Sequence, residues 1–122
     1  MPEWVHAGSV AELERDRVVY VAQARAFIVD DGSSPLALYA VSPHNGKPIT
    51  YCESSGSFED RAHGSSFDRL GRYLLGPAPR GLDRFETRVV DGDIWIDPTT
   101  LLIGPPRGEP TAPPAGVFCP TD

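Results

Sequence analysis

Proline and glycine interrupt this chain at short intervals, and their spacing limits the fold more than any other feature. Thirteen prolines and twelve glycines are spread over 122 residues. Proline breaks the hydrogen bonding of a helix interior, whereas glycine supplies the backbone angles that tight turns need. The sequence therefore predicts an all-β chain of short strands and turns, long enough for one hydrophobic core.

The apolar runs between these breaks have the composition of strands, rich in β-branched and aromatic residues. They comprise residues 17–22, 26–29, 36–41, 85–90 and 93–96. Asp91-Gly92 separates the last two runs and suits a type I′ hairpin turn. One short helix is expected over residues 10–13, with Ser9 as its N-cap and Glu12 completing a capping box.

Two stretches depart from this pattern. Residues 42–81 contain four prolines, six glycines and only brief apolar stretches, so they are expected to form long loops in which a site could lie. Seven of the thirteen prolines fall within residues 98–122, which predicts an extended and partly disordered tail. We therefore expect one domain over residues 1–97 with a Pro-rich tail.

The net charge of the chain and the lengths of its apolar runs indicate which partners and which location to expect. Eleven Lys and Arg residues oppose seventeen Asp and Glu residues, for a net charge of −6. This balance argues against nucleic-acid binding, which depends on clustered cations. No apolar run has the length of a membrane span, and residues 1–8 lack the pattern of a signal peptide. A cytoplasmic protein is expected.

The chain has two cysteines, Cys52 and Cys119, which can form at most one disulfide and are too few for a four-cysteine metal site. Cys52 lies in a brief apolar stretch and is expected to be a small buried strand residue. Cys119 lies in the Pro-rich tail and is expected to be an exposed thiol.

Three motifs in and after the loop region carry a resemblance. Residues 42–46 read Ser-Pro-His-Asn-Gly, residues 60–68 read Asp-Arg-Ala-His-Gly-Ser-Ser-Phe-Asp, and residues 76–79 read Gly-Pro-Ala-Pro. The chain resembles the Rieske iron–sulfur domain, and in particular the Rieske subunits of quinol-oxidising cytochrome complexes. In that family the first two motifs read Cys-x-His-x-Gly and Cys-x-x-His-Gly-Ser-x-Phe/Tyr-Asp. The resemblance extends over residues 4–97 and implies a small antiparallel β-sandwich or barrel with an inserted, loop-rich subdomain that formerly bound a cluster.

The resemblance also implies which residues stand at the cluster. A Rieske cluster has one iron held by two cysteines and a second held by two histidines. His44 and His63 occupy the histidine positions, but Ser42 and Asp60 occupy the cysteine positions. Hydroxyl and carboxylate oxygens are hard donors that replace soft thiolates poorly. The sequence therefore predicts four vestigial cluster positions and no [2Fe–2S] cluster.

Neighbouring positions are consistent with this loss. Further cysteines that join the two loops in the respiratory branch of the family are replaced by Lys47 and Ala62. Ser65 matches a serine that bonds a bridging sulfide in the family, and without a sulfide its hydroxyl is expected to bond the backbone. Asp68 is expected to bond nearby turn amides. Residues 76–79 are expected to pack across the loop tips as a stiff lid.

Three functions follow from this reading. The first is a non-redox accessory or interaction module of an oxidoreductase system, with no cofactor and no catalytic activity of its own. The second is a mononuclear protein that binds one Fe or Zn through His44, His63 and Asp60, because two imidazoles and a carboxylate suit either metal. The third is a Rieske electron-transfer protein with atypical ligands.

Overall fold

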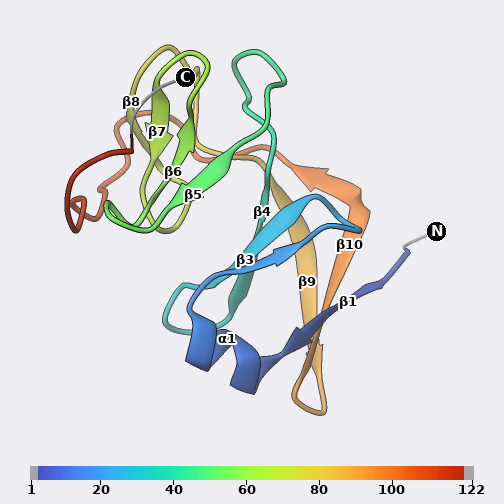
Figure 1. The fold of residues 1–122 in the computed structure, drawn as a ribbon. Coiled ribbons are helices and arrows are strands. Elements are labelled where there is room, and N and C mark those ends of the chain that lie inside the picture. The colour runs from blue at the N-terminus through green and yellow to red at the C-terminus, as the bar shows by residue number, and fades with distance from the viewer. Residues whose placement is uncertain (1–2, 120–122) are drawn as a thin grey trace. The chain divides into compact units, whose positions relative to one another are not determined.

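Residues 3–119 are described by the computed structural model, in which the strands form two sheets (Figure 1). Each sheet belongs to its own unit. Of the described residues, the larger unit contains residues 3–39 and 84–103, and the smaller unit contains residues 40–83 and 104–119.

The larger unit is an antiparallel, barrel-like sheet with the strand order β1-β10-β9-β4-β3-β2. Its elements are β1 (Val5–Ser9), α1 (Val10–Asp16), β2 (Val19–Val21), β3 (Ala26–Asp30), β4 (Pro35–Tyr39), β9 (Arg84–Val90) and β10 (Asp93–Leu102). Its core is formed by small and β-branched side chains together with Leu13 and Phe85. The all-β, Rieske-like fold class predicted from the sequence is confirmed.

The hairpin turn and the helix N-cap predicted for this unit are confirmed, whereas several elements differ in extent: the strand expected over residues 17–22 is only Val19–Val21, and the strand expected over residues 36–41 ends at Tyr39. Asp91 and Gly92 both have positive φ, at 49° and 80°, as the hairpin between β9 and β10 requires. Ser9 caps α1 by accepting from the Glu12 amide at 3.1 Å. The helix continues to Asp16, and β10 continues past the irregularity between Asp97 and Leu101 instead of ending at residue 96.

The smaller unit is a four-stranded antiparallel sheet with the order β5-β6-β7-β8. Its strands are β5 (Thr50–Cys52), β6 (Ser57–Asp60), β7 (Ser65–Phe67) and β8 (Tyr73–Leu75). These strands interrupt the long loops expected over residues 42–81, and β6 and β7 lie where the sequence gave no strand signal. Those two strands bury polar side chains, including Ser57, Glu59 and Ser65, so they lack hydrophobic periodicity.

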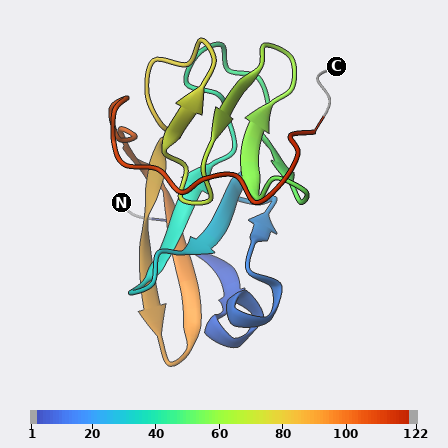
Figure 2. The ribbon, with the colours of Figure 1, turned by 90° about the vertical axis from the view of Figure 1, so that its left-hand side faces the viewer.

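The C-terminal segment, residues 104–119, is built into the smaller unit along its length (Figure 2). Three of its backbone N–H groups donate to buried carboxylates: Gly104 to Asp83 at 2.8 Å, Ala112 to Asp68 at 3.0 Å and Cys119 to Glu59 at 3.5 Å. Its last described residue, Cys119, forms a disulfide with Cys52. The prediction that Cys119 is an exposed free thiol is therefore wrong, whereas the burial of Cys52 is confirmed.

The seven-residue α1 is too short to cross a bilayer. Within residues 3–119 no helix has the length and apolar character that a membrane span requires.

Candidate functional site

The first loop of the candidate site, residues 42–47, is a tight turn held by its own backbone. Ser42 donates its N–H to the Lys47 carbonyl at 2.8 Å and accepts at its own carbonyl from the Gly46 N–H at 3.0 Å. Its hydroxyl oxygen accepts from the His44 N–H at 3.2 Å. The Ser42 side chain is buried, and its oxygen therefore serves the turn that presents His44.

The second loop, residues 60–64, repeats this arrangement with a carboxylate. The Asp60 carbonyl accepts from the Gly64 N–H at 2.8 Å, and Gly64 has a φ of 80°. Asp60 Oδ1 accepts from the amides of Ala62 at 3.0 Å and His63 at 3.3 Å. Asp60 is 1% exposed, so these donors replace the water that a carboxylate would otherwise bind.

Asn45 joins the two loops. Its Nδ2 donates to Asp60 Oδ2 at 3.2 Å and also meets Nδ1 of His63. Its Oδ1 accepts from the Lys47 N–H at 2.9 Å, which fixes the orientation of the amide. Because an amide NH₂ only donates, His63 Nδ1 is an acceptor, and a neutral His63 carries its proton on Nε2.

The two histidines lie side by side at the surface. Their ring centroids are 5.8 Å apart, and the ring planes meet at 73°. Both side chains are exposed, whereas Ser42 and Asp60 are buried. The structure thus brings all four predicted site residues onto two adjacent loops, but the hydrogen bond from Asn45 occupies the Nδ1 lone pair of His63.

The third motif closes over the second loop. Ser65 Oγ accepts from the Ala78 N–H at 3.0 Å, as expected for a serine that bonds the backbone. Gly76 lies so close that a Cβ there would be 2.5 Å from the Ser65 Cα and 2.7 Å from the Gly64 carbonyl oxygen. Asp68 accepts from the Leu70 and Arg72 amides, both at 2.9 Å, which confirms its turn role.

The donor set at the four positions does not fit a [2Fe–2S] cluster. Such a cluster takes two thiolates and two imidazoles. These positions offer one hydroxyl and one carboxylate in place of the thiolates, and both oxygens already accept N–H groups of their own loops. The two cysteines of the chain are bonded to each other and supply no thiolate.

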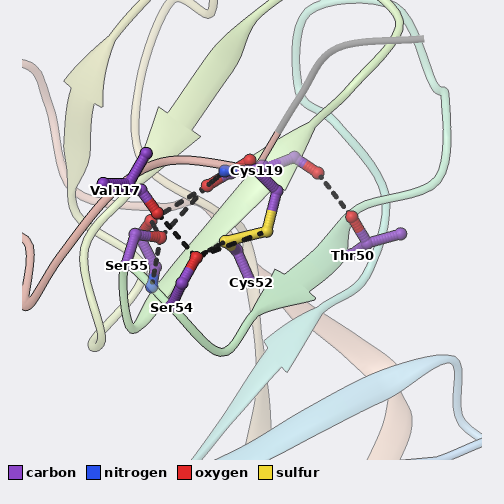
Figure 3. The surroundings of a disulfide bond; sticks show 8 residues. Thr50, Cys52, Ser54, Ser55, Val117 and Cys119 are labelled. Atoms are coloured by element: carbon purple, nitrogen blue, oxygen red, sulfur yellow. Dashed lines mark hydrogen bonds between the residues drawn. A yellow bond between two sulfur atoms is a disulfide. The ribbon is translucent and has the colours of Figure 1, made fainter.

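A second group of polar side chains surrounds the disulfide (Figure 3). Cys52 and Cys119 have a Cα–Cα distance of 5.9 Å and are 67 positions apart in the sequence. The Ser54 hydroxyl lies 3.3 Å from Cys52 Sγ and donates to the Val117 carbonyl at 2.6 Å. Buried Glu59 lies beside the bridge, within 4.8 Å of both sulfur atoms. Sequence reasoning missed this group, because no local spacing relates positions 52 and 119.

No protein-family model matches the chain. It is 30% identical over 91 residues to the cytochrome b6-f complex iron–sulfur subunit of Synechococcus elongatus, a match covering 75% of this chain and 48% of that protein. It is 35% identical over 75 residues to the cytochrome b6-f complex iron–sulfur subunit 2 of Cyanophora paradoxa, covering 60% of this chain and 31% of that protein. The chain thus spans about half or less of these relatives' lengths.

A solved structure agrees with the sequence matches. The cyanobacterial plasma membrane Rieske protein PetC3 from Synechocystis superposes with a TM-score of 0.64 at 25% sequence identity. The superposition covers 76% of this chain and 98% of the PetC3 chain. The superposition therefore extends over nearly the whole of the solved PetC3 chain.

Proposed function

Because the chain belongs to the Rieske iron–sulfur protein family, we propose that it is a member that works without a [2Fe–2S] cluster, as an accessory or interaction module of an oxidoreductase system. The observation that carries this proposal is the state of Asp60. Asp60 stands at a cysteine position of the family motif. Its buried carboxylate accepts hydrogen bonds from the Ala62 and His63 amides and from the Asn45 side chain.

The hydrogen bonds of the two loops support a fold that needs no cluster. Ser42 and Asp60 each organise their own turn, Asn45 links the turns, and the disulfide ties the C-terminal segment to β5. Buried polar groups that are mutually hydrogen-bonded rigidify a site. The loops thus have internal substitutes for the covalent ties that a metal cluster would otherwise make between them.

The names of the relatives support an oxidoreductase partner. They describe iron–sulfur subunits of cytochrome b6-f complexes. A chain that keeps the fold keeps the surface with which it would dock to such a partner. Because electron transfer requires a cofactor, that step would take place on the partner. On this proposal the chain contributes surface and position, and no catalytic residue.

A cell-based experiment tests the accessory role. The gene is deleted, and the quinol-oxidising activity of the membranes is measured with and without complementation. Full restoration by a His44→Ala/His63→Ala variant supports a role that needs no metal at the loops. The proposal fails if the deletion leaves that activity and the assembly of its complex unchanged, or if only the wild-type histidines restore them.

A mononuclear metal site is the second candidate, favoured by the adjacency of His44 and His63. With Asp60 they would give two imidazoles and a carboxylate, a set suited to Fe(II) or Zn²⁺ if the Asp60 carboxylate gives up some of the N–H groups that it accepts. Such a metal requires His63 to coordinate through Nε2, or Asn45 to release Nδ1. Elemental analysis of untagged protein with its disulfide intact tests this function. One equivalent of metal that disappears in the His44→Ala/His63→Ala variant establishes it, and less than about a tenth of an equivalent rejects it.

The cytoplasmic location expected from the sequence stays a prediction, and the cysteines offer its test. Disulfides persist in oxidising compartments and are rare in the cytosol. If intact cells are quenched with acid and labelled for thiols, a cytoplasmic chain should show Cys52 and Cys119 as free thiols. A disulfide recovered in full from such cells would place the chain in an oxidising compartment.

A further inference from the structure

We infer that the disulfide group is a redox-controlled metal site, in which Cys52, Cys119 and Glu59 bind one Zn²⁺ when the disulfide is reduced. The ligand atoms of the three residues lie within 4.8 Å of one another. The site is separate from the loops that carry His44 and His63, and it is closed to metal while the two sulfurs are bonded.

The sheet of the smaller unit positions two of the three ligands. Cys52 pairs with Ser57, and Thr50 pairs with Glu59, so Cys52 and Glu59 lie diagonally on one face of the β5–β6 ladder. Both side chains are buried, at 0% and 6% exposure. A metal that takes these two ligands therefore finds them already ordered by strand pairing, which lowers the entropic cost of assembling the site.

The carboxylate of Glu59 is oriented in the manner of a metal ligand. Its Oε2 accepts from the hydroxyls of Ser55 at 3.1 Å and Ser57 at 3.3 Å. Hydrogen bonds of this kind from outer residues fix the direction of ligating carboxylates in metal sites. No guanidinium or ammonium group is needed to hold this carboxylate, because hydroxyl donors and the Cys119 amide reach it.

The third ligand comes from the C-terminal segment, whose last described residues are less enclosed. Val117 and Phe118 are exposed, and Cys119 is half-buried. Two zinc-bound thiolates lie about 3.8 Å apart when each Zn–S bond is about 2.3 Å and the angle is tetrahedral. After reduction, zinc binding therefore requires only a small outward movement of Cys119, while Cys52 and Glu59 stay in their strands.

The chemistry balances with a dithiol as the reductant. The dithiol transfers two electrons and two protons to the Cys52–Cys119 bridge, which becomes two thiols, and the dithiol itself is oxidised to a disulfide. Zn²⁺ then displaces the two thiol protons into solvent and forms two Zn–S bonds. Two thiolates and a carboxylate carry three negative charges, so a divalent cation relieves their mutual repulsion. Water completes four-coordination.

The test titrates the full chain with Co²⁺, a spectroscopic probe for zinc sites, in its reduced and its oxidised form. The reduced chain is expected to bind one Co²⁺ with thiolate-to-metal charge-transfer bands, Zn²⁺ to displace it, and the oxidised chain to give no such bands. Cys119→Ser is expected to abolish the bands, and Glu59→Gln to weaken binding by about ten-fold or more. Glu53→Gln, the matched control at an exposed carboxylate next to Cys52, should bind as the wild type does.

Three results would overturn the inference. The first is a reduced chain without thiolate bands at one equivalent of Co²⁺. The second is thiolate bands that survive in Cys119→Ser or are lost in Glu53→Gln. The third concerns folding: if reduction abolishes the near-ultraviolet circular dichroism of the chain and Zn²⁺ does not restore it, the site does not exist. Restoration by Zn²⁺ in the wild type, and not in Cys52→Ser, would support it.

Discussion

Asn45 Nδ2 lies 3.2 Å from Asp60 Oδ2, so an amide from one loop donates to the carboxylate that stands at a cysteine position of the other. This contact links the two loops directly, and the same Asp60 side chain also accepts from the Ala62 amide. The residue that removes a thiolate from the family motif thus supplies the hydrogen bonds that hold the loops in their positions.

Removal of the Asp60 carboxylate should destabilise the chain. Asp60→Ala leaves the Ala62 and His63 amides and the Asn45 side chain without their acceptor, and unpaired groups of this kind cost about 1–3 kcal/mol. The free energy of unfolding, measured by chemical denaturation, checks this loss. Asp30→Ala is the matched control, because Asp30 accepts from Gly32 at an exposed turn, and it should cost about 0.5 kcal/mol or less. Equal losses would contradict the role assigned to Asp60.

Gly76 should not tolerate a side chain. Its φ is +97°, and a Cβ would lie 2.5 Å from the Ser65 Cα. Gly32→Ala is the matched control, since Gly32 has a φ of +101° but nothing within 4 Å of the added Cβ. The control should lose only the conformational cost, about 1–2 kcal/mol, whereas Gly76→Ala should lose more because backbone atoms must move. Thermal unfolding of both variants measures the difference, and similar midpoints would show that the third motif does not pack on the second loop as described.

Acid should lower the stability of the larger unit by protonating Asp97. Hydrogen bonds from the side chains of Thr100 and Thr99, and from backbone amides, lower the pKa of Asp97 from 3.8 to about 2. Because the folded-state pKa lies below the unfolded value, this stabilisation is present above pH 3.8 and is lost as the pH falls toward 2. Unfolding midpoints between pH 2 and 6 check the slope. Asp97→Asn should flatten the curve over this window, and an unchanged pH dependence in that variant would reject the assignment.

Reduction of the disulfide should loosen the C-terminal segment when a chelator keeps metal away. The bridge closes a span of 67 positions, and disulfides stabilise proteins by about 2–4 kcal/mol. Hydrogen exchange measures the effect at the Ala112 and Ala115 amides, which bond to Asp68 and to the Ser55 carbonyl. Their protection should fall in the reduced chain, while the amides of the β9–β10 hairpin, in the other unit, should change less. Equal exchange rates of the Ala112 and Ala115 amides in the reduced and the oxidised chain would show that the bridge adds no stability.

The predictable parts of the fold are those with local causes. The β9–β10 hairpin follows from Asp91-Gly92, where both residues take positive φ, and the start of α1 follows from the Ser9 cap. In contrast, β6 carries Ser57 and Glu59 on a buried face, and Glu59 is satisfied by donors that include residue 119. No pattern within a short window of sequence encodes such a partnership.

The candidate site divides in the same way. The resemblance to the Rieske motifs identified Ser42, His44, Asp60 and His63, and the structure brings them onto neighbouring loops. The part played by Asn45 could not be read from the sequence, because an asparagine in a turn also has an ordinary local role, which Asn45 performs toward Lys47. The pairing of Cys52 with Cys119 depends on the path of the whole C-terminal segment.

The most direct test of the central claim is the iron and sulfide content of the purified chain after anaerobic reconstitution, read together with its visible and paramagnetic resonance spectra. The Ser42→Cys/Asp60→Cys variant, which restores the family's thiolates, is the positive control for the scaffold. We predict that the wild-type chain retains neither iron nor acid-labile sulfide and has no [2Fe–2S] bands. Two irons and two sulfides per wild-type chain, with a Rieske-type spectrum, would contradict the account.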